Sequence, residues 1–137
     1  LKKRVNFLEE TFALLKLENI TAIHGRAEEF AKNKAYREQY DLCVSRAVSN
    51  LATLSEYCLP YVKVGGNFIS YKSGTVQEEL QQAEKAVKIL GGKIQDVVYF
   101  NLPDSEIQRS LVVIEKMKPT PSRYPRKAGT PLKEPLS

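Results

Sequence analysis

The sequence predicts an α/β layered fold with a mostly parallel sheet. Along the chain, apolar residues alternate between helical spacing and short runs of strand length, in the order helix, strand, helix, strand, helix, strand, helix, strand, strand. This alternation is typical of crossover units, in which helices cover both faces of a parallel sheet. The last two strands are separated by a polar loop only, which favours an antiparallel pair. The 137 residues suit one domain.

The first half of the chain is expected to contain two helical segments and two strands. Residues 1–17 predict an amphipathic helix, because their apolar residues recur at spacings of three and four. That apolar stripe consists of Val5, Leu8, Phe12 and Leu15. Residues 21–24 form a short predicted strand, and residues 27–30 suit one helical turn. Tyr40–Ser45 is a near-continuous apolar run, typical of a buried parallel strand.

The second half begins with a helix that Asn50 is expected to cap. Gly65-Gly66 predicts a turn, followed by a strand at residues 67–71. Thr75 and Glu78 have the spacing of a capping box, which predicts the start of the next helix. Gly91-Gly92 is expected to end that helix, and residues 94–100 and 111–115 are the last two predicted strands.

The net charge of +5 is concentrated at the C-terminus. Residues 1–115 hold equal numbers of basic and acidic side chains, whereas residues 116–137 hold six basic residues and only Glu134. Five prolines after Lys118 predict an irregular segment. We therefore expect residues 1–118 to form a domain and residues 119–137 a basic, proline-rich tail. Such a tail favours a polyanionic partner, and a solvated tail that aids solubility is the alternative.

Several classes of protein are disfavoured by what the sequence lacks. No stretch approaches the roughly 20 apolar residues of a membrane span, and Leu1, Lys2, Lys3 and Arg4 do not predict a signal peptide. His24 is the only histidine, and Cys43 and Cys58 are isolated, so we expect no metal site and two reduced, buried cysteines. Walker, dinucleotide-binding and nucleophile-elbow motifs are all missing. The catalytic residues are therefore left unassigned.

Positive side chains follow three successive predicted strands. They are Arg26, Arg46 and Lys72. Ligands of open α/β sheets bind at the carboxyl ends of the strands, so we expect these cations to point into one crevice. Such a crevice suits a ligand that carries phosphate or carboxylate groups. The alternative is a set of surface cations paired with neighbouring carboxylates.

A set of short strings together resembles one known family. The strings are Leu1–Glu9, Gly25–Glu28, Tyr40-Asp41 leading to Ser45-Arg46-Ala47, Tyr71–Gly74, Arg109–Ile114 and, in the tail, Tyr124–Pro131. In order and spacing they are similar to the RsmG family, also called GidB, over essentially the whole chain. The resemblance implies a Rossmann-like class I methyltransferase sheet, mostly parallel with the last strand antiparallel. It also implies that the first two strands and the glycine-rich cofactor loop precede Leu1, so that this chain alone binds its cofactor poorly.

The resemblance further implies transfer of a methyl group from S-adenosyl-L-methionine to N7 of a guanine in bacterial 16S rRNA. It assigns Ala27, Glu28 and Arg46 to the cofactor. The basic positions that it assigns to RNA are Lys3, Arg4, Arg26, Lys72 and Arg109. The implied partner is 16S rRNA or the small ribosomal subunit, with no membrane and no metal, in the cytoplasm. Tyr124 is expected either to stack on RNA or to hold the tail on the body.

Two other functions remain open at this point. One is a non-catalytic RNA-binding α/β domain, which needs no glycine loop. The other is a methyltransferase that acts on a protein or a small molecule. The basic tail favours RNA over the latter.

Overall fold

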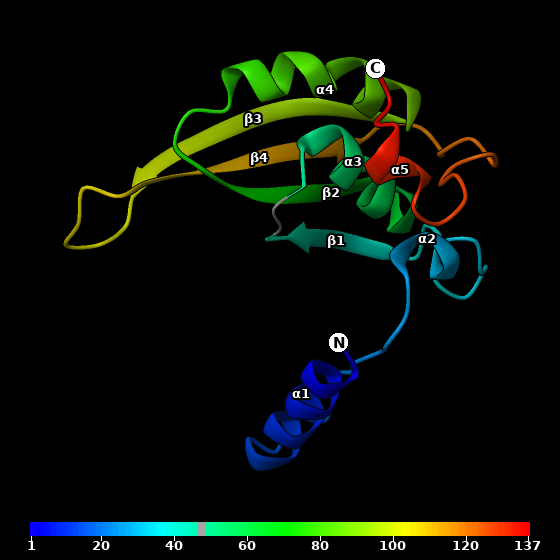
Figure 1. Cartoon of the computed structure of the whole chain (residues 1–137), viewed down its shortest axis with the longest axis vertical. Helices are drawn as coiled ribbons and strands as arrows, with labels where there is room; N and C mark the ends of the chain where they lie inside the picture. The colour runs from blue at the N-terminus through cyan, green and yellow to red at the C-terminus, as the bar shows by residue number, and fades with distance from the viewer. Residues whose placement is uncertain (47–48) are drawn as a thin grey trace.

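The computed structural model describes residues 1–46 and 49–137. Its centre is a four-stranded sheet with the order β1-β2-β4-β3 (Figure 1). The strands are β1 (Tyr40–Ser45), β2 (Val62–Ser73), β3 (Gly92–Asn101) and β4 (Gln108–Lys116). β1 and β2 are parallel, and β4 is antiparallel to both of its neighbours. Three strands therefore run one way and the last strand runs against them, which confirms the predicted α/β class and the predicted direction of the last strand.

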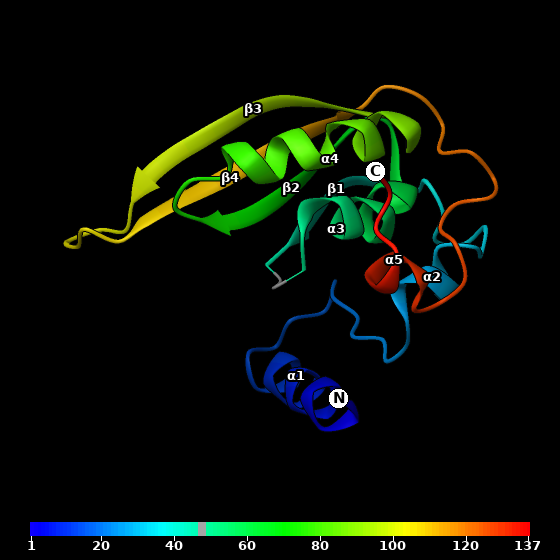
Figure 2. The same ribbon diagram turned by 45° about the horizontal axis from the view of Figure 1, so that its top comes forward.

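Two helices cover one face of this sheet. They are α3 (Leu51–Cys58) and α4 (Gln77–Ile89), and Figure 2 shows both on the same side. Phe68, Val112 and Ile114 project from the sheet into the core between these layers. The prediction of helices on both faces is wrong for the described residues, because β1 and the other face of β2 remain open. Leu42 and Val44 of β1 are accordingly exposed, although they were expected to be buried.

Two of the three local signals that predict ends of these helices are confirmed. Asn50 caps α3, and its side-chain oxygen accepts a hydrogen bond from the Thr53 amide at 2.9 Å. Gly91 follows α4 with φ +93°, a conformation that only glycine adopts without strain. The predicted capping box is wrong, because α4 begins at Gln77 and Val76 occupies the N-cap position.

Two predicted strand features differ from the structure. Residues 21–24 form no strand. A strand needs a hydrogen-bonded neighbour, and the described sheet offers this segment none. Gly65-Gly66 lies inside β2 instead of in a turn. The two glycines belong to a bulge, because five steps of β2 from Val62 to Asn67 face two steps of β1 from Tyr40 to Leu42.

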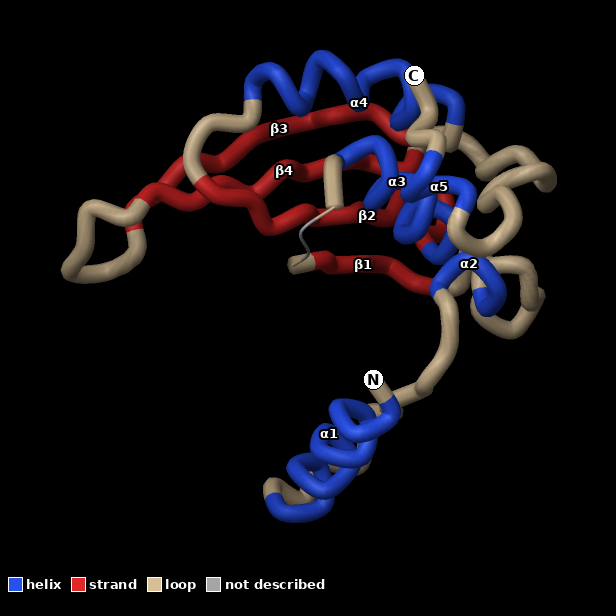
Figure 3. The backbone as a smooth tube through the Cα atoms, viewed as in Figure 1, coloured by secondary structure: helices blue, strands red, loops and turns tan. Residues whose placement is uncertain are grey.

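The N-terminal helix α1 (Lys2–Leu14) forms as predicted but buries no residue. Figures 1 and 3 show it apart from the sheet, connected by residues 15–26. Its apolar stripe is therefore uncovered in this structure. Within the described residues, none of the helices has both the length and the apolar composition that a bilayer crossing requires.

The C-terminal segment packs on the body at the amino end of β2, near α2 (Ala27–Phe30) (Figure 1). The Arg37 guanidinium donates hydrogen bonds to the carbonyl oxygens of Thr120, Pro121 and Tyr124 at 3.0, 3.1 and 2.8 Å. Tyr124 is 8% exposed and belongs to the core. Of its two expected roles, the packing role fits the structure and stacking on RNA does not.

Two cations of the basic segment are engaged internally. Arg126 forms an ion pair with Glu56 at 2.8 Å, and the buried Lys116 ammonium contacts Glu38 at 3.0 Å. Burial lowers the pKa of Lys116, and Glu38 opposes that shift. Residues after Pro119 are not wholly irregular, because α5 (Thr130–Lys133) forms one helical turn. The division at residue 118 stays a prediction.

Candidate functional site

The carboxyl ends of β1 and β2 open onto a groove of about 1010 Å³. Its lining comes from the end of both strands, the start of α4 and the β3–β4 hairpin. Prominent among the lining residues are Arg46, Tyr71, Lys72, Phe100, Arg109 and Leu111. This is the edge at which open α/β sheets bind their ligands.

The groove is predominantly cationic. Arg46, Lys72 and Arg109 line it, and Glu79 is the one carboxylate among the described lining residues. Of the three cations expected after successive strands, two therefore do lie together. Arg109 joins them from β4, where it faces Ser73 of β2 across the ladder. An anionic ligand is favoured here.

The ammonium group of Lys72 is bound by neighbouring groups of the protein. Its ammonium lies 2.7 Å from a Glu79 oxygen and donates to the Ser49 carbonyl at 2.8 Å, and the side chain is only 10% exposed. The same Glu79 oxygen accepts the Leu51 amide at 2.7 Å. Glu79 therefore joins the end of β2 to the starts of α3 and α4. Glu79 is not among the predicted site residues, although an acidic side chain in the first turn of a helix is a recognisable signal.

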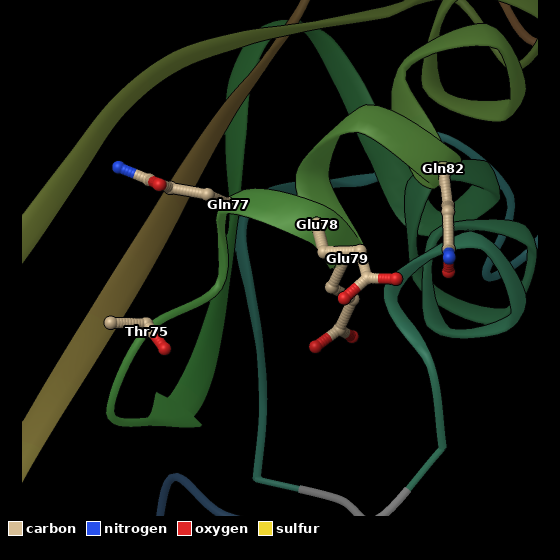
Figure 4. A pocket seen from close by; sticks show the side chains of 5 residues that line it. All are labelled: Thr75, Gln77, Glu78, Glu79 and Gln82. Atoms are coloured by element: carbon tan, nitrogen blue, oxygen red, sulfur yellow. The ribbon is translucent and has the colours of Figure 1, made fainter.

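A smaller hollow of about 560 Å³ lies beside the start of α4 (Figure 4). Thr75, Gln77, Glu78, Glu79 and Gln82 line it. Figure 4 shows the side chains of Glu78 and Glu79 on the first turn of α4, and both line the hollow. Two carboxylates disfavour an anion, so the cationic groove is the better candidate site.

Arg26, Ala27 and Glu28 lie at the opposite end of the sheet. The hydroxyl of Tyr61, the residue just before β2, donates a hydrogen bond to the Ala27 carbonyl at 2.5 Å. Glu28 is buried, and its carboxylate accepts the Gly129 amide at 3.0 Å. The expectation that Arg26 shares a crevice with Arg46 is therefore wrong. Residues 21–24 form no strand, so the residues after them are not placed at a carboxyl end.

The remaining predicted positions lie outside the groove. Lys3 and Arg4 are exposed on α1, apart from the sheet. Ala47, which belongs to one of the strings above, lies outside the described residues.

The cysteines and tyrosines show the effects of partial burial. Cys43 and Cys58 are free and half-buried. A hydrogen bond with Cys58 lowers the pKa of Cys43, and the same bond with burial raises the pKa of Cys58. Burial raises the pKa of Tyr61 to about 12.

No group of three or more His, Cys, Asp or Glu side chains in the described part of the chain is arranged to hold a metal ion.

Comparison with known proteins places the chain among methyltransferase sequences. Residues 1–112 match the family described as "GidB: rRNA small subunit methyltransferase G". A ribosomal RNA small subunit methyltransferase G of Lachnoclostridium phytofermentans is 56% identical, over 99% of this chain and 56% of the relative. The protein of the same name from Clostridium novyi is 53% identical over the same shares. The chain thus spans about half the length of the curated relatives it matches.

Solved structures resemble this one in fold. The M1.HpyAVI-SAM complex superposes with a TM-score of 0.53 at 12% identity, over 71% of this chain and 53% of that chain. A mutant of MtNAS superposes with a TM-score of 0.56 at 14% identity, over 86% and 42%. At these identities the likeness shows the α/β fold with its mixed sheet.

Proposed function

Because the chain belongs to the GidB family, rRNA small subunit methyltransferase G, we propose that the complete protein methylates N7 of a guanine in small-subunit rRNA. S-adenosylmethionine is the proposed methyl donor. The substrate is 16S rRNA or the small ribosomal subunit, and the place of action is the cytoplasm. In the structure, the observation that supports this proposal is the meeting of Arg46 and Arg109 in one groove at the carboxyl ends of β1 and β2.

The chemistry of the proposed reaction suits these side chains. Guanine N7 carries an in-plane lone pair and no proton, so it attacks a sulfonium methyl group without a general base. The protein must align the nitrogen with that methyl group and exclude water. Arginines can grip phosphate groups or the guanine edge, provided that N7 stays free. Arg46 and Arg109 fit this binding and orienting role.

The three residues proposed for the cofactor do not form one site in this structure. Arg46 lies in the groove, whereas Ala27 and Glu28 lie at the other end of the sheet. The Glu28 carboxylate is already engaged by Gly129. We therefore derive no catalytic step from Ala27 or Glu28, and we propose that Arg46 binds an anionic group in the groove.

The proposed RNA contacts divide into two kinds. Lys3, Arg4 and Arg26 are exposed, and we propose that they contact phosphates, as we do for Arg109. The ion pair with Glu79 supports a different contribution for Lys72, which is to fix the end of β2 beside the groove.

The test uses the complete protein with labelled S-adenosylmethionine and small-subunit rRNA. Arg46→Ala is expected to abolish formation of 7-methylguanosine while the fold, followed by circular dichroism, stays intact. Lys88→Ala is the matched control, because Lys88 is an exposed cation at the far end of α4. Near-normal methylation by Arg46→Ala would remove Arg46 from the site. Salt-dependent RNA binding without methylation by the wild type would favour the non-catalytic RNA-binding domain.

A further inference from the structure

Two exposed aromatic rings line the groove beside its cations. Tyr71 of β2 is 47% exposed and Phe100 of β3 is 40% exposed. Among the described residues, neither ring takes part in an aromatic pair or belongs to the hydrophobic core. Large apolar rings that face a groove mark binding surfaces more often than isolated exposed residues do.

The strand register places these rings on one surface. Arg109 of β4 is opposite Ser73 on one side and Phe100 on the other, and Leu111 is opposite Tyr71. Residues two apart on a strand point to the same face. Tyr71, Phe100, Arg109 and Leu111 therefore share the sheet face that α3 and α4 leave open. We name these four residues the aromatic shelf.

The composition of the aromatic shelf matches one class of ligand. Proteins that bind unpaired RNA stack bases on aromatic side chains of a sheet and contact the phosphates with arginine. The groove holds three cations against one carboxylate, and that carboxylate is paired with Lys72. The excess positive charge favours a polyanion over an apolar protein partner.

We propose that Tyr71 and Phe100 stack on unpaired bases of the RNA substrate, while Arg109 contacts the adjoining phosphate. The proposal rests on the proposed function and deepens it, since it names the side chains that hold the bases. A base must leave its helical stack before it can enter an active site, and aromatic rings supply replacement stacking partners.

Tyr99 provides the matched control. It neighbours Phe100 on β3 and is 51% exposed, but it is opposite the buried Ser110 and so points to the other face. Tyr99→Ala removes a ring of the same strand that is at least as exposed as Phe100, without altering the aromatic shelf.

The experiment measures binding of the complete protein to a short single-stranded RNA that contains 2-aminopurine, at several salt concentrations. Phe100→Ala and Tyr71→Ala are each expected to weaken binding about fivefold or more, with an unchanged salt slope. Stacking on these rings should quench the fluorescence of 2-aminopurine when the wild type binds. The two alanine variants should quench it less. Arg109→Ala is expected to lower the salt slope by about one, and Tyr99→Ala to change neither quantity.

Two further variants separate stacking from simple packing. Phe100→Tyr keeps a ring and should bind as the wild type does, whereas Phe100→Leu keeps apolar bulk and should bind as weakly as Phe100→Ala. Wild-type affinity in Phe100→Leu would overturn the stacking role. A lower melting temperature of the alanine variants with unchanged RNA affinity would also overturn it, because the rings would then pack against protein.

Methyl transfer by the same proteins separates the two proposals. If the wild type methylates rRNA and the ring variants bind RNA normally, the aromatic shelf is refuted and the proposed function stands. If ring substitutions weaken RNA binding but no protein transfers a methyl group, the proposed function fails and the aromatic shelf stands.

Discussion

The ion pair between Glu56 and Arg126 tests whether the basic C-terminal segment stabilises the fold. The Glu56 side chain is 1% exposed and lies 2.8 Å from the Arg126 guanidinium, which also bonds the Glu134 carbonyl. In Arg126→Ala, only the backbone amide at 2.7 Å continues to bind the carboxylate. Removing one partner of a buried pair costs about 3–5 kcal/mol. We expect the lower end, about 3 kcal/mol, because Arg126 is 25% exposed and the amide bond remains.

The assay is guanidinium unfolding of the complete protein, followed by circular dichroism. Lys127→Ala is the control, since Lys127 is the exposed neighbouring cation and its loss should change the unfolding free energy by less than about 0.5 kcal/mol. Adding Glu56→Gln to Arg126→Ala should recover part of the loss, because the buried charge is then absent. A cost below about 1 kcal/mol for Arg126→Ala, or a double variant less stable than the single one, would refute this reasoning.

Three further predictions concern stability. Strain at positive φ costs about 1–2 kcal/mol in both Gly91→Ala and Gly65→Ala, because the two glycines have nearly the same φ. Gly91→Ala should destabilise the protein further, because its Cβ would collide with the Lys118 carbonyl, whereas the Cβ of Gly65→Ala meets open space. Equal unfolding free energies of the two variants would contradict this. Glu79→Ala should cost about 2 kcal/mol, because the Lys72 ammonium keeps only the Ser49 carbonyl and the first amide of α3 loses its side-chain acceptor. Thermal melting should show no such loss for Glu78→Ala, which removes an exposed neighbouring carboxylate. The pKa of Tyr61 is near 10 in the unfolded chain and about 12 in the folded protein. The stability that this shift contributes is therefore complete below pH 10 and is lost as the pH rises to 12. If the unfolding free energies of the wild type and of Tyr61→Phe depend on pH in the same way over this range, this contribution is excluded.

Features of the fold that depend on local chemistry were predictable from the sequence. The Asn50 cap, the Gly91 helix end and the extent of β1 each follow from a few adjacent residues. Residues 21–24 show the limit of this reasoning. Their composition suits a strand, but a strand forms only where another strand pairs with it, and no local pattern reports on that partner.

The candidate site was predictable to a similar extent. Arg46 and Lys72 lie in one groove because each lies at the carboxyl end of a strand that does form, Arg46 just after β1 and Lys72 in the last two residues of β2. Arg26 follows the segment that does not, so the same rule failed there. The ion pair between Glu56 and Arg126 joins residues 70 positions apart, and no spacing rule could have indicated it. Part of the basic charge of the tail is therefore paired with the body and is not free for a polyanionic partner.

The most direct test of the proposed methylation compares small-subunit rRNA from cells that have or lack the gene. Nuclease digestion and mass spectrometry would locate 7-methylguanosine in each rRNA. We predict that one 7-methylguanosine disappears with the gene and returns with the complete wild-type protein but not with Arg46→Ala. An identical set of methylated guanines in both rRNAs would contradict the proposed function.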